Sequence, residues 1–148
     1  MKTKVYLDTS VISALFDDRT PERLMMTSIL WSKLSDYEVF ISELVLEEIE
    51  RTSPLIRDKM VLAIKDFNVL KMSEEAEGLA EIYVKQGIFP EKYFDDALHV
   101  ALAAVNQIGI LLSWNFAHLV KLKTRRMVSM VNLSENMMPV EIASPPEL

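Results

Sequence analysis

The sequence has 148 residues, half of them hydrophobic, and a formal net charge of −6 at pH 7. This length and composition suit one domain with its own core, so we expect residues 1–148 to form a single domain without a linker. The lack of cysteine and of any glycine-rich phosphate loop excludes disulfide frameworks, thiolate metal sites, cysteine nucleophiles, Rossmann fingerprints and Walker loops.

Short apolar runs alternate with helical patterns along the first half of the chain. Hydroxyl side chains favour helix starts because they accept hydrogen bonds from the free N–H groups of a first turn. The predicted elements are a strand at 4–7, a short helix capped by Thr9 or Ser10 that reaches Phe16, a helix from Pro21 to about Asp36 capped by Thr20, a strand at 39–41, a helix from Glu43 to Thr52 capped by Ser42, and a helix at about 55–66.

The second half continues the alternation, with Gly87 and Gly109 suited to end its two middle helices. The predicted elements are a strand at 69–70, a helix from Ser73 to about Gln86, a helix at 93–107, a strand at 110–112, a basic helix near 117–131 and an edge strand at 140–142. The helix at 93–107 is apolar nearly all round, which predicts that it lies in the interior. The alternation predicts a three-layer α/β fold whose central, mainly parallel sheet is flanked by helices and binds ligands beyond the carboxyl ends of its strands.

No segment predicts insertion into a membrane. The apolar run after the basic N-terminus is interrupted at Asp8, too early for the core of a signal peptide. The uncharged stretch 97–120 is broken by polar side chains, so we interpret it as a buried helix followed by a buried strand. Together with the lack of cysteine, these features predict a cytoplasmic protein.

The acidic net charge argues against a broad nucleic-acid surface, since attraction to phosphates usually shows as a basic surplus. Carboxylates clustered around a metal ion would account for part of that charge. The one basic cluster consists of Lys121, Lys123, Arg125 and Arg126. We interpret it first as a solvated helix end and second as a phosphate contact.

Three acidic positions are candidates for chemistry. Asp8 follows a strand, where an aspartate serves equally well as a helix cap or as a site residue. Glu48 shares a helical face with three apolar residues and therefore points into the fold, whereas Glu47 belongs to the solvated face. Asp95 and Asp96 both open an apolar helix, where a carboxylate offsets the helix dipole, and periodicity does not choose between them.

Four short stretches follow one another in a recurrent order: VYLDTS at 5–10, SELVLEEI at 42–49, DALHVA at 96–101 and LLSWNF at 111–116. Together they resemble the motifs of the PIN domain, a fold shared by many prokaryotic toxin ribonucleases of the VapC type. The resemblance spans the chain nearly end to end. It implies an acidic site for Mg²⁺ or Mn²⁺ built from Asp8, Glu48, Asp96 and Asn115, and it selects Asp96 over Asp95.

Two positions depart from the motifs that this resemblance supplies. Asn115 stands where many members have aspartate, and His118 occupies a later position that is often acidic. The site therefore offers three carboxylates, and we expect one metal ion to bind and a second to be held weakly if at all. Three carboxylates without metal repel one another, so at least one pKa should rise and the fold should lose stability as pH increases.

The resemblance implies metal-dependent hydrolysis of RNA phosphodiester bonds, with Thr9 and Ser10 holding Asp8 in place. A catalytically weak or silent scaffold that binds RNA or a protein partner is the alternative, because of Asn115 and the acidic charge. An aspartyl-phosphate enzyme that uses Asp8 is disfavoured, since its pattern needs a second aspartate where this chain has Ser10. We place both histidines, His99 and His118, outside the site, because a lone histidine on an apolar helix is usually packed and hydrogen-bonded.

The helix from Pro21 has apolar residues over more than one face, which indicates either burial on two sides or a partner. The VapC resemblance implies a homodimer and the toxin of a toxin-antitoxin pair, masked by a small antitoxin protein. We therefore expect RNA as substrate, a possible antitoxin as partner and no association with a membrane.

Overall fold

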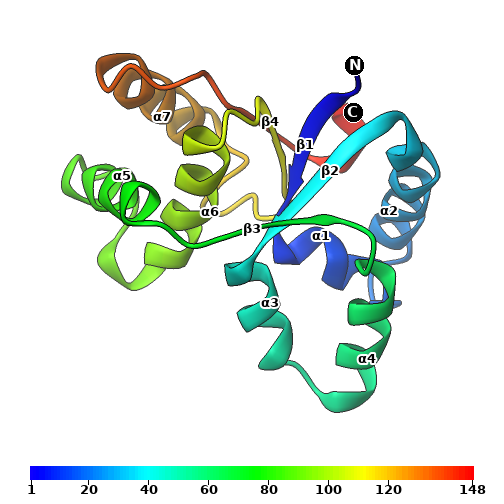
Figure 1. Ribbon diagram of the computed structural model, residues 1–148. Coiled ribbons are helices and arrows are strands. Elements are labelled where there is room, and N and C mark those ends of the chain that lie inside the picture. Colours follow the sequence, from blue (N-terminus) through cyan, green and yellow to red (C-terminus); the bar gives the residue numbers. More distant parts are fainter.

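The computed structural model describes residues 1–148 and contains one central sheet with helices on both sides (Figure 1). The strands are β1 (Thr3–Leu7), β2 (Tyr37–Ser42), β3 (Asn68–Leu70), β4 (Ile110–Leu112) and β5 (Glu141–Ala143). The helices are α1 (Thr9–Ala14), α2 (Pro21–Lys33), α3 (Glu43–Glu50), α4 (Pro54–Ala63), α5 (Glu74–Lys85), α6 (Phe94–Val105) and α7 (Leu122–Ser134). Short 3₁₀ turns occupy Leu34–Asp36, Glu91–Tyr93 and Pro145–Glu147.

All neighbouring strands are parallel, in the order β3-β2-β1-β4-β5. The chain adds β2 and β3 on one side of β1 and then β4 and β5 on the other, so the order reverses between β1 and β4. Leu7 pairs with Leu112 across these two strands. Their carboxyl ends, Asp8 and Ser113, therefore lie together at the point where open parallel sheets bind ligands.

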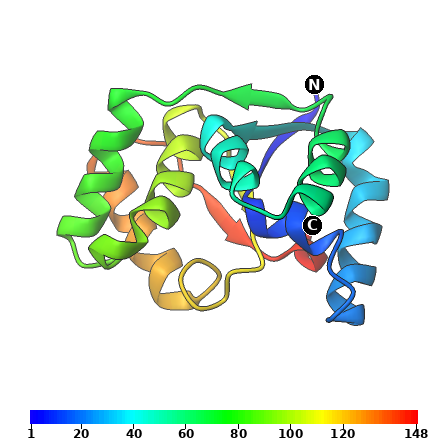
Figure 2. The same cartoon turned by 90° about the horizontal axis from the view of Figure 1, so that it is seen from below.

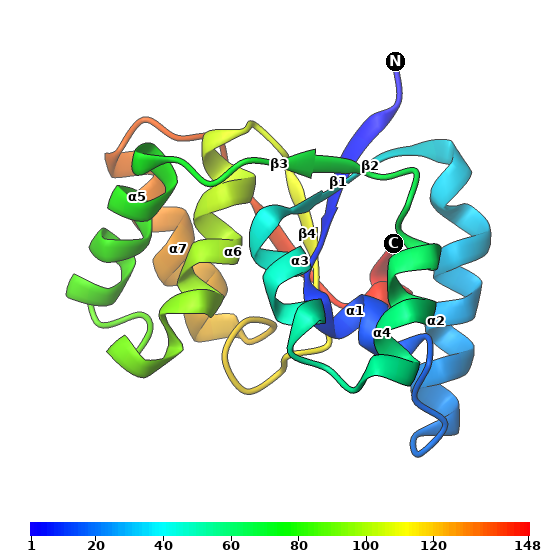
Figure 3. The same cartoon turned by 60° about the horizontal axis from the view of Figure 1, so that its bottom comes forward.

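Two helical layers cover the sheet. Helices α5, α6 and α7 gather on one side, and α1, α2 and α4 on the other, with α3 next to α1 and α4 (Figures 1 and 3). Figure 2, seen from below, looks onto the edge where β1 ends and α1 begins. The predicted three-layer α/β fold with a central parallel sheet is thus confirmed, because buried strands such as β1 and β4 need apolar cover on both faces.

Two of the seven helices begin with a hydroxyl side chain that makes the capping hydrogen bond. Ser42 and Ser73 cap α3 and α5 through their side chains, as the sequence predicts. The prediction that Thr9 or Ser10 caps the first helix is wrong, since the cap is Asp8, whose carboxylate accepts from the Val11 N–H. Thr20 stands at the N-cap of α2 without a side-chain bond, because Pro21 presets the first turn.

Helix α6 is the interior helix that the sequence predicts, with eight consecutive buried residues from Ala97 to Ala104. Its end differs from the prediction: it stops at Val105, and Gln107 rather than Gly109 adopts the left-handed conformation (φ 59°). Gly87 does take that conformation after α5, with φ 78°. The basic helix begins later than predicted, at Leu122, and β5 is the expected edge strand.

Helix α2 has its apolar residues in three environments. Leu30 is buried in the core, and Trp31 packs against Phe67 with ring centroids 5.9 Å apart. Met25 and Ile29 are exposed, at 58% and 50%. Burial on two sides therefore accounts for part of the wide apolar surface, and two side chains remain outside it. None of the helices has the length and hydropathy needed to span a bilayer.

The sheet centre and the outer helices should differ in their tolerance of truncation. Leu111 in β4 is fully buried, so Leu111→Ala should lower the free energy of unfolding by about 2–5 kcal/mol through lost burial and a residual cavity. Leu133 in α7 is 80% exposed, so Leu133→Ala should stay within about 0.5 kcal/mol of wild type. Urea denaturation measures both, and equal losses would contradict this packing.

Candidate active site

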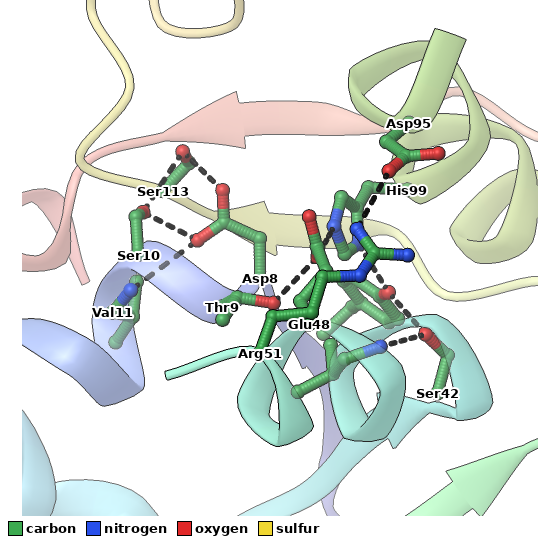
Figure 4. Close-up of polar contacts among 12 residues, drawn as sticks. Asp8, Thr9, Ser10, Val11, Ser42, Glu48, Arg51, Asp95, His99 and Ser113 are labelled. Atoms are coloured by element: carbon green, nitrogen blue, oxygen red, sulfur yellow. Dashed lines mark hydrogen bonds and ion pairs between the residues drawn. The ribbon is translucent and has the colours of Figure 1, made fainter. Parts of the chain in front are cut away.

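Asp8 is buried at the junction of β1 and α1, with 4% of its surface exposed. Its Oδ1 accepts from the Ser10 hydroxyl at 2.5 Å and from the Val11 N–H at 3.3 Å, and its Oδ2 accepts from the Ser113 hydroxyl at 2.5 Å. Figure 4 shows the carboxylate held between these donors. Burial raises the pKa of Asp8, against the lowering effect of nearby His99 and the hydroxyl donors. Asp8 is therefore both a helix cap and a member of the site.

Glu48 reaches the same region from α3, with its side chain 25% exposed. The Thr9 hydroxyl donates to Glu48 Oε1 at 2.7 Å, and His99 Nε2 lies 2.6 Å from the same oxygen. The other oxygen, Oε2, receives no hydrogen bond from the protein. The prediction that Thr9 and Ser10 both hold Asp8 in place is therefore right for Ser10 and wrong for Thr9, whose hydroxyl binds Glu48 instead.

His99 links the site to the core through a line of hydrogen bonds. Its Nδ1 lies 2.7 Å from the Tyr6 hydroxyl, which lies 2.8 Å from the Ser42 hydroxyl, and all three residues are buried. Our expectation that His99 is packed and hydrogen-bonded is correct, but its exclusion from the site is wrong, because its other ring nitrogen contacts Glu48 (Figure 4). One signal was available: position 99 is one helical turn after Asp96, on the same face of α6.

Glu48 and His99 stabilise each other's charged forms. Burial opposes ionisation of Glu48, yet the contacts with His99 and Thr9 outweigh it and hold the pKa of Glu48 below its usual value. Burial likewise opposes protonation of His99, but the bond and charge of Glu48, with Asp8 and Asp96 nearby, raise the pKa of His99. Histidine and glutamate thus form a partly buried ion pair.

Asp96 and Asp95 have different surroundings although they are neighbours on α6. Asp96 is half-buried and accepts no hydrogen bond from the protein. Burial raises its pKa, the two site histidines lower it, and the charges of Asp8 and Glu48 raise it further. Asp95 points to Arg51 instead, at 3.9 Å, with nearly half of its side chain exposed. The electrostatic coupling therefore joins Asp96, and not Asp95, to the other two carboxylates.

Asn115 lies at the carboxyl end of β4 but directs its side-chain oxygen to its own turn. Its Oδ1 accepts from the His118 N–H at 2.9 Å, and its backbone N–H donates to Ser113 Oγ at 2.9 Å. The ring of His118 stacks on Tyr93, with centroids 3.9 Å apart. Asn115 therefore shapes the loop beside the site, and its role as a metal ligand stays a prediction.

The oxygen atoms of these carboxylates suit a hard divalent cation, but they do not form a complete coordination shell. No three acidic or histidine side chains stand close enough together to share one ion. The carboxylate of Asp96 and the Oε2 atom of Glu48 nevertheless receive no hydrogen bond from the protein. Burial is the main cause of the raised pKa of Asp96, and the charges of Asp8 and Glu48 raise it further. These residues fit a hydrated ion bound by one or two carboxylates and bridged to the third by water, the usual mode of Mg²⁺.

The sequence matches the PIN-domain family over residues 5–115, most of its length. This chain belongs to the PIN-domain family. Its fold is similar to VapC20 from Mycobacterium tuberculosis, a sarcin-ricin loop cleaving toxin, with a TM-score of 0.62 and 19% identity over 77% of this chain and 92% of that chain. It is also similar to VapBC2 from Rickettsia felis, solved bound to a DNA fragment from its promoter, with a TM-score of 0.60 and 12% identity over 96% of this chain and 98% of that chain. No curated protein sequence matches this chain significantly.

The chain of hydrogen bonds that runs from Ser42 through Tyr6 and His99 to Glu48 should depend on the Tyr6 hydroxyl. Tyr6→Phe removes the oxygen that bonds both Ser42 and His99, so it should lower the free energy of unfolding by about 1–3 kcal/mol. Tyr37→Phe is the matched control, because the Tyr37 hydroxyl makes no hydrogen bond with the protein, and it should stay within about 0.5 kcal/mol of wild type. Chemical denaturation compares the two, and an equal effect would refute the network.

Stability should also depend on pH in a direction that follows from these groups. The raised pKa values of Asp8, Asp96 and His99 mean that the folded state binds more protons than the unfolded state, so stability falls as pH rises from the ordinary carboxyl value through the raised histidine value. The lowered pKa of Glu48 acts oppositely, and its contribution is lost in acid. Melting temperatures measured in chelator from about pH 4 to about pH 9 should therefore be highest at mildly acidic pH. A maximum on the alkaline side would contradict the assignment.

Proposed function

We propose that this PIN-domain protein is an endoribonuclease that hydrolyses RNA phosphodiester bonds with the aid of Mg²⁺ or Mn²⁺. The observation that carries the proposal is that the charges of Asp8 and Glu48 act on Asp96, although these residues follow β1 and lie in α3 and α6 respectively. Unrelated capping residues would be scattered over the fold. Their electrostatic coupling and the unpartnered oxygens of Asp96 support a cation site.

Asp96, Glu48 and Asp8 are the groups that would hold the cation. A bound divalent ion supplies an activated water and stabilises the charge that develops on the phosphate oxygens. The bonds from Ser10 and Ser113 favour the ionised form of Asp8 and fix its direction, and those from Thr9 and His99 do the same for Glu48. The chain's own contribution is therefore a rigid set of carboxylates that a substrate phosphate can approach from the open edge of the sheet.

We also propose that this chain is the toxin of a toxin-antitoxin pair. VapC20 is a sarcin-ricin loop cleaving toxin, and VapBC2 was solved on promoter DNA. The exposed Met25 and Ile29 on α2 support a protein partner, either a second copy of this chain or a small antitoxin. A chain that stays monomeric at all accessible concentrations would count against the homodimer and leave the nuclease proposal intact.

A second candidate function is a PIN scaffold that binds RNA or protein without cleaving. It is favoured by one observation, the lack of a ready group of three metal-binding side chains, and by Asn115 in place of an acid. The two functions differ in whether RNA is cut when divalent metal is present.

Two adjacent aspartates, Asp95 and Asp96, should differ in their contribution to metal binding. A cation that binds only the folded form adds RT ln(1 + [L]/Kd), about 2.7 kcal/mol at a hundredfold excess over Kd, and should raise the melting temperature clearly. Asp96→Asn should blunt this rise and abolish cleavage of a mixed RNA pool in Mn²⁺, because it removes one ligand charge. Asp95→Asn should leave both nearly unchanged, since Asp95 faces Arg51 at the surface.

Two controls make this comparison decisive. A reaction with chelator in place of Mn²⁺ should show no cleavage by wild type. Cleavage that survives chelation or persists in Asp96→Asn would refute the mechanism. A metal-dependent rise in melting temperature without cleavage would select the scaffold.

A further inference from the structure

A cavity of about 290 Å³ adjoins the candidate active site. Ser10 and Asn115 line it and also belong to the site's framework, since the Ser10 hydroxyl donates to Asp8 and accepts from the Trp114 N–H at 2.9 Å. The cavity and the buried carboxylate of Asp8 therefore share Ser10. The volume lies near the lower limit of about 300 Å³ for small-ligand pockets, which leaves room for one nucleotide.

The cavity contains an arginine that the protein leaves without an anionic partner. Arg23, from the first turn of α2, makes no ion pair and no side-chain hydrogen bond. Its guanidinium lies 4.8 Å from the centre of the Trp114 ring. That ring is 7% exposed and is fixed by a 2.9 Å bond from its Nε1 to Thr27. The charge is thus held in a defined place by cation-π contact while its donors stay free.

The one acidic residue of the cavity, Asp17, is near enough for the charge of Arg23 to help lower its pKa, but its ion pair is with Arg19 and not with Arg23. Arg19 holds Asp17 through two bonds of 2.9 Å, which lower the pKa of Asp17 to about 2. The remaining groups suit an anion with sugar hydroxyls attached: Thr20 lines the cavity without making a capping bond, and the start of α2 carries the positive end of the helix dipole. In a chain of net charge −6, this cation lines the same cavity as Ser10, which holds Asp8.

We propose that this cavity is a subsite for single-stranded RNA, in which Arg23 binds the phosphodiester next to the one that is cut. The proposal rests on the proposed function and names the form of its substrate. A guanidinium forms a planar fork that matches two phosphate oxygens, and its stacking on Trp114 reduces the entropy lost on binding. A cavity of this size holds one nucleotide, so we expect the subsite to prefer unpaired strands.

The test measures RNA binding apart from cleavage. In an Asp96→Asn background, which keeps the strand uncut, the affinity for a fluorescent single-stranded RNA oligonucleotide is followed by anisotropy over a range of KCl concentrations. Each phosphate contact with a single strand contributes about 0.7 to the slope of log K against log salt. Arg23→Gln should reduce the slope by about 0.7 and weaken binding about tenfold at low salt. Arg23→Lys keeps the charge without the fork and should preserve the slope with a several-fold weaker affinity.

Arg126→Gln is the matched control, because it removes the same charge from the basic cluster on α7 and lies outside the cavity. It should leave the slope unchanged. A slope that Arg23→Gln does not alter, or a loss seen only with Arg126→Gln, overturns the subsite. Equal melting temperatures of the three variants and their parent show that folding is not the cause.

Cleavage assays with the otherwise unmodified chain separate this proposal from the proposed function. Arg23→Gln should raise KM with kcat within about twofold of wild type, since a contact with a phosphate that does not react is the same in the ground and transition states. Cleavage with an unchanged KM and slope refutes the subsite and keeps the nuclease. A reduced slope in a chain that never cleaves RNA supports the subsite and refutes the nuclease.

Discussion

The buried carboxylate of Asp8 is the constraint on which the rest of the structure depends. A charge with 4% exposure is tolerated only when hydrogen-bond donors replace water, and here the donors come from three places: a hydroxyl in α1, a backbone N–H of α1 and a hydroxyl after β4. The same residue ends β1, caps α1 and fixes the pairing of β1 with β4. The position of the candidate site is therefore a consequence of how the sheet satisfies one aspartate.

The second organising contact is the ion pair between His99 and Glu48. Three carboxylates at one edge would repel one another, and the imidazole compensates part of that charge from inside the fold. It does so from α6, the helix that also carries Asp96, so one buried element contributes both a ligand candidate and its counter-charge. The hydrogen bonds from His99 to Tyr6 and from Tyr6 to Ser42 connect α6 to β1 and β2. They therefore hold the site residues against the rigid core.

Much of the fold and part of the site could be predicted from the sequence. Alternating patterns gave the order of strands and helices, and the apolar face of α3 selected Glu48, because periodicity reports which residues face the core. Periodicity could not separate Asp95 from Asp96, since α6 is apolar nearly all round, and only the resemblance did so. Other features of the site depend on side-chain contacts that no local sequence pattern encodes. They are the partners of His99, the different carboxylates that Thr9 and Ser10 bind, and the turn made by Asn115. The cap of α1 was missed because Asp8 competed with two hydroxyl residues that suit the position equally well.

The bond between Asp8 and Ser113 joins residues 105 positions apart, and this separation has a consequence for synthesis of the chain. While the ribosome has made only the first hundred residues, β4 does not exist, and the aspartate that ends β1 has neither its second hydroxyl donor nor its neighbouring strand. Long-range pairing of this kind forms late because loop closure must come first. A nascent chain therefore exposes Asp8 to water and carries an incomplete site. The candidate site is therefore complete only after nearly the whole polypeptide has been released to fold.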